Sequence, residues 1–175
     1  MPTAQPASKV HQPAKRASSA PGPDAVALLK KDHAEVKALF KEYDKLAEAH
    51  AEARQRQMLG LQICEMLTVH ATIEEEIFYP AARDALSADK EDLLDEAEVE
   101  HASAKDLIAQ IRSTDADDSL YNARIKVLGE YIDHHVKEEE NEVLRSLGKN
   151  SLDLAAMGER IAARKQQLMA LPEPS

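Results

Sequence analysis

The fold is decided by the stretch LTVHATIEEEIFYPA at residues 67–81, in which His70 is followed four residues later by Glu74. A second stretch, YIDHHVKEEENEV at residues 131–143, has the same arrangement. In both cases apolar residues stand three and seven positions before the histidine. At 100° per residue these spacings place side chains on one face of a helix. The two stretches therefore predict two amphipathic helices whose buried faces carry a histidine and a glutamate one turn apart.

Helical periodicity extends over most of the chain. Few glycines and an abundance of Ala, Glu, Leu and Lys also favour helix. Asp24 is a suitable N-cap for a first helix, and the Asp-rich polar segment 113–119 is predicted to be a loop. We expect long amphipathic helices at about residues 24–49, 51–86, 90–112 and 120–147. Short links make neighbouring helices antiparallel, so the predicted fold class is all-α, an up-down-up-down antiparallel four-helix bundle.

The two ends of the chain differ from this bundle, which we assign to residues 24–147. Residues 1–23 contain five prolines among Ala, Ser, Lys and Arg. Such a segment buries too little apolar surface to offset its ordering entropy, so we expect a disordered N-terminal tail. Gly148 and Asn150 are expected to end the fourth helix. The remaining residues, 148–175, are expected to form a short extra C-terminal helix followed by a tail.

Composition excludes several classes of protein. The net charge of −10, from 22 basic and 32 acidic residues, argues against nucleic acid as a partner. No run of about eighteen apolar residues occurs, so no contact with a membrane interior is expected. The N-terminus has no apolar core of the signal-peptide kind, which predicts a cytoplasmic protein. We expect a monomer or a weak homo-oligomer, and the single cysteine, Cys64, excludes an internal disulfide.

Each of the four predicted helices carries one histidine on its apolar stripe. A buried polar ring without a partner costs about 1–3 kcal/mol, and one shared metal centre would satisfy all four rings together. With the two glutamates, the candidate ligands are His33, His70, Glu74, His101, His135 and Glu139. Four imidazoles and two carboxylates suit a dinuclear site in which both glutamates bridge the metals. This mixture favours iron or manganese over metals that prefer thiolates, while residue type alone leaves zinc open.

The fourth helix offers a second candidate pair, His134 and Glu138, which is also spaced by four. We prefer His135 and Glu139, because His134 lies about 100° away, toward the edge of the apolar stripe. Glu98 shares a face with His101 and is expected to hold an imidazole proton or to complete the ligand set. Tyr43 and Tyr131 are expected to pack in the core or line the pocket, and Cys64 is expected to be small core filler. The other carboxylates near the site are expected to be solvated, namely Glu75, Glu76, Glu138 and Glu140.

With these motifs the chain resembles the hemerythrin-like HHE cation-binding proteins. The resemblance covers residues 24–147 and rests on KKDHAEVKALF, LTVHATIEEEIFYPA, EAEVEHASAKDLI and YIDHHVKEEENEV in that order. It implies a non-haem centre of two iron ions bridged by an oxo or hydroxo group, with the six residues above as ligands and with manganese or zinc as less favoured metals. The chain departs from the oxygen carriers, since Ala97 and Lys105 stand four residues on either side of His101. It also has a glutamate four residues after His135 where the carriers have an aspartate five residues on.

In these two respects the chain is more similar to the bacterial single-domain relatives, which are linked with the handling of iron, oxygen, nitric oxide or peroxide. The first hypothesis is therefore a di-iron protein that binds or senses O2, NO or peroxide, or that protects against iron or oxidative stress. The second is an enzyme that uses the same centre to remove peroxide or reduce nitric oxide. No residue is an obvious separate acid, base or nucleophile, which favours a binding protein. The third is a metal-free helical interaction module.

Overall fold

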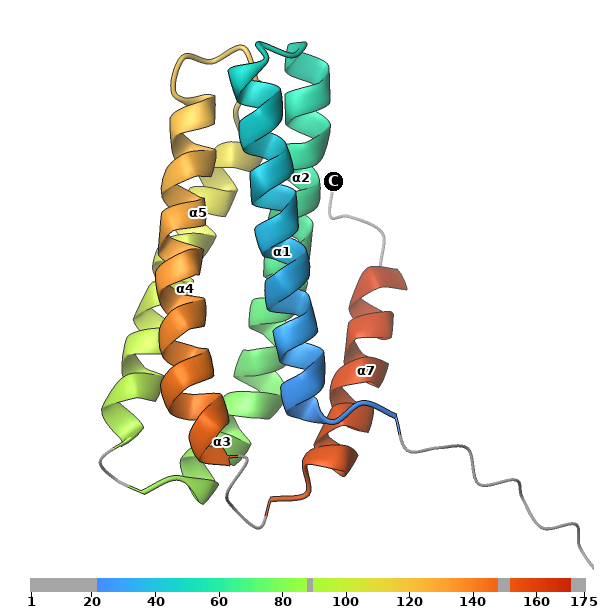
Figure 1. Ribbon diagram of the computed structural model, residues 1–175, viewed down its shortest axis with the longest axis vertical. Helices are drawn as coiled ribbons and strands as arrows, with labels where there is room; N and C mark the ends of the chain where they lie inside the picture. Colours follow the sequence, from blue (N-terminus) through green and yellow to red (C-terminus); the bar gives the residue numbers. More distant parts are fainter. Residues whose placement is uncertain (1–21, 88–89, 148–151, 171–175) are drawn as a thin grey trace, which may run out of the picture.

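The structure is a computed structural model that describes residues 22–87, 90–147 and 152–170. Within these residues every secondary-structure element is a helix (Figure 1). The four main helices are α1 (Ala25–Glu48), α2 (Ala53–Ile73), α4 (Glu91–Arg112) and α5 (Tyr121–Glu138). They form the antiparallel up-down-up-down bundle expected from the sequence, with the α1–α2 and α4–α5 connections at the same end (Figure 1).

The first helix begins and ends with well-defined capping structures. The Asp24 side chain accepts a hydrogen bond from the Ala27 backbone N–H at 2.8 Å, as expected of an N-cap. At the other end His50 has a left-handed φ of 50°. The His50 and Ala51 N–H groups donate to the carbonyls of Ala47 and Leu46 at 3.1 and 2.9 Å, respectively. This is a Schellman ending, in which a glycine is the usual left-handed residue.

The second and fourth helices are each interrupted by a π-helical turn. In the second helix, α2 is followed by a π-helix, η1 (Glu74–Phe78), and by α3 (Tyr79–Ala85). In the fourth, α5 is followed by η3 (Glu139–Leu144) and by α6 (Arg145–Leu147). The sequence predicted the extent of both helices but not these turns. Each π-helix begins at the glutamate that follows the histidine by four, and such turns occur frequently at functional sites.

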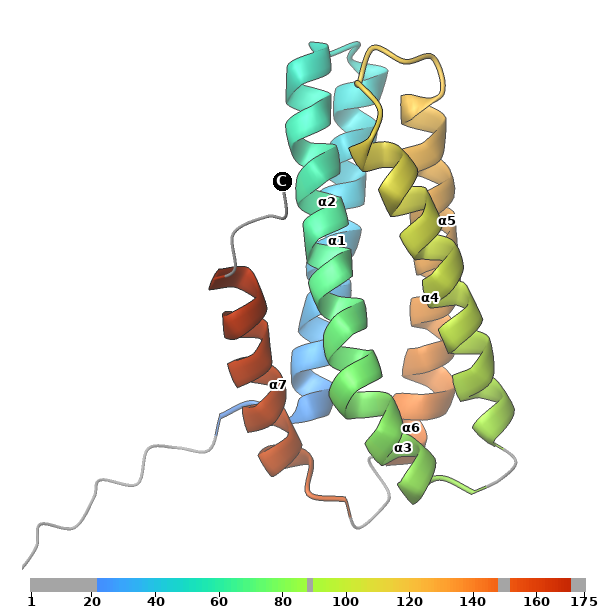
Figure 2. The same ribbon diagram turned by 180° about the vertical axis from the view of Figure 1, so that it is seen from behind.

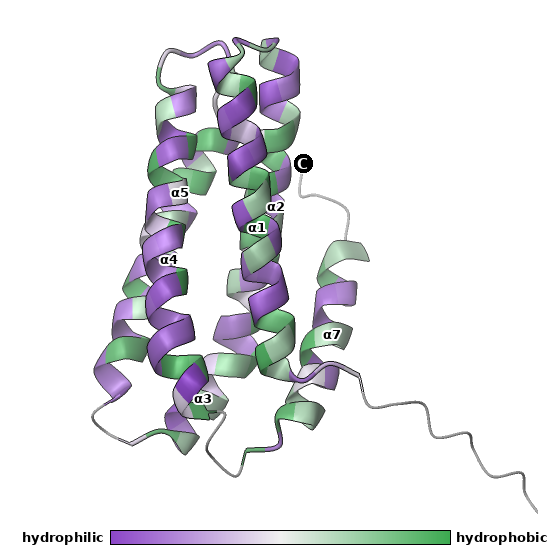
Figure 3. Ribbon diagram, viewed as in Figure 1, coloured by the Kyte–Doolittle hydropathy of each residue, from purple (hydrophilic) through white to green (hydrophobic). Residues whose placement is uncertain are grey.

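The core consists of two apolar clusters separated by a polar layer. One cluster, which includes Ile63 and Leu128, fills the end of the bundle near the α1–α2 connection, and the other includes Leu29 and Phe78. Hydrophilic residues lie along the outward sides of α1 and α5 (Figure 3). On every main helix the buried histidine stands between residues of the two clusters. The polar layer is therefore closed off from both ends of the bundle.

A fifth helix, α7 (Leu154–Ala170), packs outside the bundle against α1 and α2 (Figure 2). Met157 and Ile161 are buried in this contact. A Cβ atom on Gly158 would lie 2.6 Å from the carbonyl oxygen of Pro23, so glycine allows this close approach to the start of α1. The short C-terminal helix expected from the sequence is confirmed. The structure shows in addition that this helix packs on the bundle.

Some of the expectations concern residues that the structure does not describe. All but the last two residues of the expected N-terminal tail, and the expected stop at Gly148 and Asn150, lie outside the described residues. In the described part of the chain, no helix combines the length and apolar character needed to cross a lipid bilayer.

Candidate metal centre

The structure brings all six predicted ligands together in the polar layer of the core. Their exposed fractions range from 0% to 7%. His33 comes from α1 and His101 from α4, while α2 with η1 and α5 with η3 each supply a histidine and a glutamate. The four imidazoles therefore converge from four different helices, as the apolar stripes predicted.

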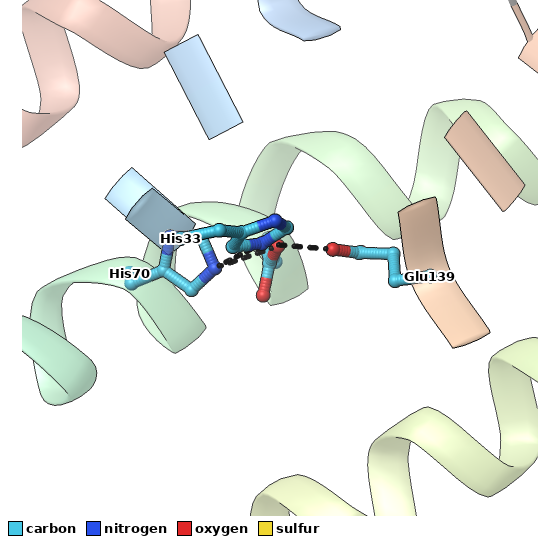
Figure 4. A group of neighbouring side chains, drawn as sticks. His33, His70 and Glu139 are labelled. Atoms are coloured by element: carbon cyan, nitrogen blue, oxygen red, sulfur yellow. Dashed lines mark hydrogen bonds and ion pairs between the residues drawn. The ribbon is translucent and has the colours of Figure 1, made fainter. Parts of the chain in front are cut away.

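Four of these residues, which we call the first group, surround one point. The Nε2 atoms of His33 and His70 lie 3.1 Å apart. His70 Nε2 is 3.0 Å from Glu74 Oε1, and His33 Nε2 is 3.2 Å from Glu139 Oε2. The two rings meet edge to face, with an interplanar angle of 72°, while Glu139 approaches from the opposite side (Figure 4). These are the residue types and separations of a site for one metal ion.

The second group consists of His101, His135 and again Glu74. The Nε2 atoms of His101 and His135 lie 3.3 Å apart, and His101 Nε2 is 3.3 Å from Glu74 Oε2. Glu74 thus faces the first group with one carboxylate oxygen and the second group with the other. This is the arrangement of a bridging carboxylate, whereas a bridging role for Glu139 remains a prediction.

The two glutamates are buried and face imidazole nitrogens. No hydrogen bond of good geometry reaches an oxygen of Glu74 or Glu139 in the described residues, although imidazole nitrogens lie 3.0–3.3 Å away. Buried carboxylates are ordinarily paired or bound to a metal, because removal of their charge from water is costly. The donor set present therefore fits two cations that prefer nitrogen and oxygen ligands.

The outward nitrogens of the imidazoles face a second layer of carboxylates. His33 Nδ1 is 2.9 Å from Glu140, His101 Nδ1 is 3.0 Å from Glu75 and His135 Nδ1 is 2.8 Å from Glu100. His70 Nδ1 lies further from its carboxylate, at 3.6 Å from Asp32. A carboxylate at Nδ1 holds the ring in place and keeps Nε2 free to face a metal.

This second layer follows an internal two-fold pattern that sequence reasoning missed. Asp32 and Glu100 directly precede the histidines of α1 and α4, while Glu75 and Glu140 directly follow the two buried glutamates. The expectation that Glu75 and Glu140 are merely solvated is therefore wrong. A search for acidic residues repeated beside each candidate ligand in both halves of the bundle would have found all four.

Two other expectations are corrected by the structure, and one choice between alternatives is supported. Glu98 does not hold an imidazole proton, because it pairs with Arg83 at 2.8 Å on the surface while Glu100 contacts His135. Tyr131 is 49% exposed and neither packs in the core nor lines the pocket. His134 is exposed, so the structure favours His135 and Glu139 over the second candidate pair, His134 and Glu138, as ligands of the buried centre.

Two expected core residues are buried as predicted. Tyr43 is buried and donates a hydrogen bond to the Asn122 side chain at 2.8 Å, in the apolar cluster near the α1–α2 connection. Cys64 is buried in the same cluster, and burial raises the pKa of its thiol to about 11. Both residues thus act in packing.

The charges of the centre depend strongly on one another. Burial alone would lower the pKa of His70, but Glu74, Asp32 and Glu139 raise this pKa to about 10. Burial would raise the pKa of Glu74, but His70 and His101 hold it well below its usual value. Burial and the neighbouring Glu74 raise the pKa of Glu139. In the metal-free protein His70 is therefore an imidazolium at neutral pH, and this proton occupies the place of a cation.

Tyr79 is a further residue of the site that the periodicity did not reveal. It is 1% exposed, and its hydroxyl lies 3.3 Å from His101 Nε2. Burial, together with Glu74 and Glu139, raises its pKa well above the usual value. The Tyr79 backbone N–H donates to the Glu74 carbonyl, so the tyrosine stands one π turn after the glutamate. An α-helical periodicity of 3.6 residues would have placed it elsewhere.

A small apolar cavity of about 20 Å³ adjoins the four histidine rings. Its remaining walls are mainly apolar, from residues such as Leu67, Ile108 and Ile132, and Lys105 also contributes. A cavity of roughly 10–15 Å³ holds one water molecule, so this space suits a ligand of one or two heavy atoms.

Comparisons with known proteins agree with this geometry. Residues 24–147 match the family model of the hemerythrin HHE cation binding domain, and the chain belongs to this family. The fold is similar to a hemerythrin HHE cation binding domain-containing protein from Mycobacterium kansasii. That similarity has a TM-score of 0.66 at 22% identity and covers 84% of this chain and 88% of the other.

A curated relative is similar in sequence but much longer. It is a DNA nickase from Nostoc sp., 28% identical over 124 residues. The match covers 70% of this chain and 33% of the relative. The chain thus spans about a third of the length of that protein.

Proposed function

We propose that this protein is a non-haem di-iron protein that binds a small ligand such as O2, NO or peroxide, in sensing or in protection against iron and oxidative stress. The observation that carries the proposal is the pair of buried glutamates whose carboxylates lie among four buried imidazoles, in two groups of metal-ligating side chains. His33, His70, Glu74 and Glu139 would hold one ion, and His101, His135 and Glu74 the other. When bound, two iron ions would supply redox chemistry and open positions for the small ligand.

The surrounding residues have the properties that such a centre needs. Glu75, Glu100 and Glu140 orient three of the rings through Nδ1. The two apolar clusters exclude water from both ends, and the cavity beside the histidines has room for a diatomic molecule. Tyr79 places a hydroxyl at the second group, where it is able to donate a hydrogen bond.

We do not propose nicking of DNA for this chain. The similarity to the nickase covers a third of that protein, and the net charge of −10 opposes contact with phosphate backbones. We propose instead a protein that acts without nucleic acid or membrane, in the cytoplasm, as a monomer or weak homo-oligomer.

Metal analysis after anaerobic loading with Fe2+ tests the proposal. We expect two iron ions per chain and a visible absorption band that changes on exposure to air, NO or peroxide. Less than one metal per chain after loading would contradict the proposal and favour a metal-free interaction module. Steady release of oxygen from hydrogen peroxide, faster than with free iron, would instead identify the centre as that of an enzyme.

A further inference from the structure

A second set of possible metal ligands lies on the surface next to the buried centre. It consists of Glu100 from α4 with His134 and Glu138 from α5, and we call it the outer group. His134 Nε2 is 3.6 Å from Glu100 Oε1 and 3.5 Å from Glu138 Oε1. The side chain of His134 is 60% exposed, so this group faces water. None of the three residues has a role as an inner ligand in the proposed centre.

The outer group is joined to the buried centre through Glu100. One carboxylate oxygen of Glu100 faces His134, and the other lies 2.8 Å from Nδ1 of His135. His135 in turn presents its Nε2 to the second group. The outer and buried groups are therefore separated by a single side chain.

A small cavity of about 10 Å³ lies between the outer group and the buried centre. Its polar walls come from Glu100, Glu138, His135, Glu139 and Tyr79, and its apolar walls come from Leu93, Ala97 and Val143. Glu139 is 3% exposed, and neither of its oxygens has a hydrogen-bond partner in the described residues. A buried carboxylate of the proposed centre thus lines the same narrow space as Glu100 and Glu138 of the outer group. Polar atoms suitable for a cation are present from the surface to the core.

The other half of the bundle carries different side chains at the corresponding positions, although its buried ligands are arranged in the same way. His134 and Glu138 directly precede His135 and Glu139, whereas Val69 and Ile73 directly precede His70 and Glu74. Val69 and Ile73 are buried. The equivalent of Glu100 is Asp32, and it is paired with Lys165 of α7 at 2.5 Å. Apolar side chains thus stand at the positions that correspond to His134 and Glu138, and the carboxylate that corresponds to Glu100 is paired with an ammonium group.

We propose that Glu100, His134 and Glu138 form an entry site that receives a hydrated divalent transition-metal ion before it passes between α4 and α5 to the buried centre. The inference rests on the proposed function of that centre. One imidazole and two carboxylates leave several coordination positions to water, which makes binding weak and exchange fast. The ligand atoms lie within 4.8 Å of one another, so small side-chain movements would close them around an ion.

The test uses the full chain and the double variant His134→Ala/Glu138→Gln. Glu100 is kept, because its replacement would also disturb His135. The matched control is His50→Ala/Glu42→Gln, which makes the same chemical changes at exposed positions of α1 and its C-terminal end, on a different helix from the outer group. Uptake of Co2+, followed by stopped-flow absorption, should be slower by about tenfold or more in the outer-group variant, the scale of electrostatic focusing of an ion into a cleft. Both variants should still hold as many metal ions at equilibrium as the wild type.

A second measurement detects the site directly. Mn2+ added to the metal-loaded wild type should bind weakly at one additional site, and this binding should disappear in the outer-group variant. Equal uptake rates in the two variants would overturn the entry site while the proposed function stands. Loss of equilibrium metal in the outer-group variant alone would also overturn it, since the residues would then belong to the buried centre. Failure of the wild type itself to hold metal would overturn the proposed function.

Discussion

Lys165 of α7 lies 2.5 Å from Asp32 of α1, a buried carboxylate whose other oxygen is 3.6 Å from Nδ1 of His70. The C-terminal helix is therefore connected to a candidate metal ligand through a single side chain. Burial alone would raise the pKa of Asp32, but His70 and Lys165 lower it below its usual value. Arg164 pairs with Glu76 in the same contact, at 2.6 and 2.9 Å.

Replacement of Lys165 by Met should destabilise the fold, because Asp32 would remain as a buried charge with a weaker partner. We expect a loss of about 1–3 kcal/mol, measured by urea unfolding of the metal-free protein at neutral pH. Arg160→Met on an exposed position of α7 is the control and should change stability little. Equal effects of the two substitutions would show that the Lys165–Asp32 pair contributes nothing specific.

Metal binding should release protons. His70 is an imidazolium in the metal-free protein at neutral pH, because its pKa is raised to about 10. A metal requires the neutral ring, so at least one proton per chain should be released at pH 7, measured by calorimetry in buffers of different ionisation enthalpy with Zn2+ as a redox-silent probe. Apparent affinity should rise between pH 6 and 9. An affinity independent of pH would contradict the protonated state of His70.

The same shift predicts how the stability of the metal-free protein depends on pH. The pKa of His70 is raised from 6.5 in the unfolded chain to about 10 in the fold. Its contribution is therefore complete below pH 6.5 and is lost as the pH rises through 10. Urea midpoints should fall over this range for the metal-free protein, whereas the metal-loaded protein should not show this loss. A midpoint that rises over this range in the metal-free protein would contradict the assignment.

The two buried glutamates should differ when each is replaced by Gln. Glu74 faces both groups, whereas the contact of Glu139 described above is with His33 of the first group. We expect Glu74→Gln to reduce bound iron below one per chain and Glu139→Gln to leave about one, held by the second group. Glu130→Gln is the control and should keep full loading. Equal losses in the two variants would indicate that both glutamates bridge.

Adjacent carboxylates allow a test of the second layer. Glu75 lies 3.0 Å from His101 Nδ1, whereas Glu76 pairs with Arg164 away from the rings. Glu75→Gln should weaken metal affinity by about 10–100-fold, the usual effect of a lost partner of a ligating histidine. Glu76→Gln should leave affinity near that of the wild type. Competition with a chromophoric chelator measures both, and equal affinities would exclude an orienting role for Glu75.

Stability should increase when His50 is replaced by Gly. His50 ends α1 with a φ of 50°, a conformation that costs a side-chain-bearing residue about 1–2 kcal/mol. We expect a gain of about 1 kcal/mol in thermal or urea unfolding. His50→Ala keeps the strained conformation and should give no such gain. A destabilised glycine variant would show that the His50 side chain makes a compensating contact.

Much of the fold and the six buried residues could be predicted from spacing alone. A helix repeats every 3.6 residues, so each buried histidine shared a face with apolar neighbours, and Glu74 and Glu139 followed one turn later. The same argument separated His135 from the exposed His134. Residues that share one face of a helix can be predicted from the sequence, because their spacing along the chain sets which side of the helix they occupy.

Other features depended on which helices meet and could not be derived from local spacing. The carboxylates of Glu75, Glu100 and Glu140 each contact a ring on a different helix, and Tyr79 reaches the site only through a π turn. The sequence by itself thus determined the bundle and its inward polar layer, because helical periodicity sets which side each residue faces. Only the tertiary structure decided which carboxylate orients which histidine and which side α7 covers, since these contacts join residues up to 133 positions apart.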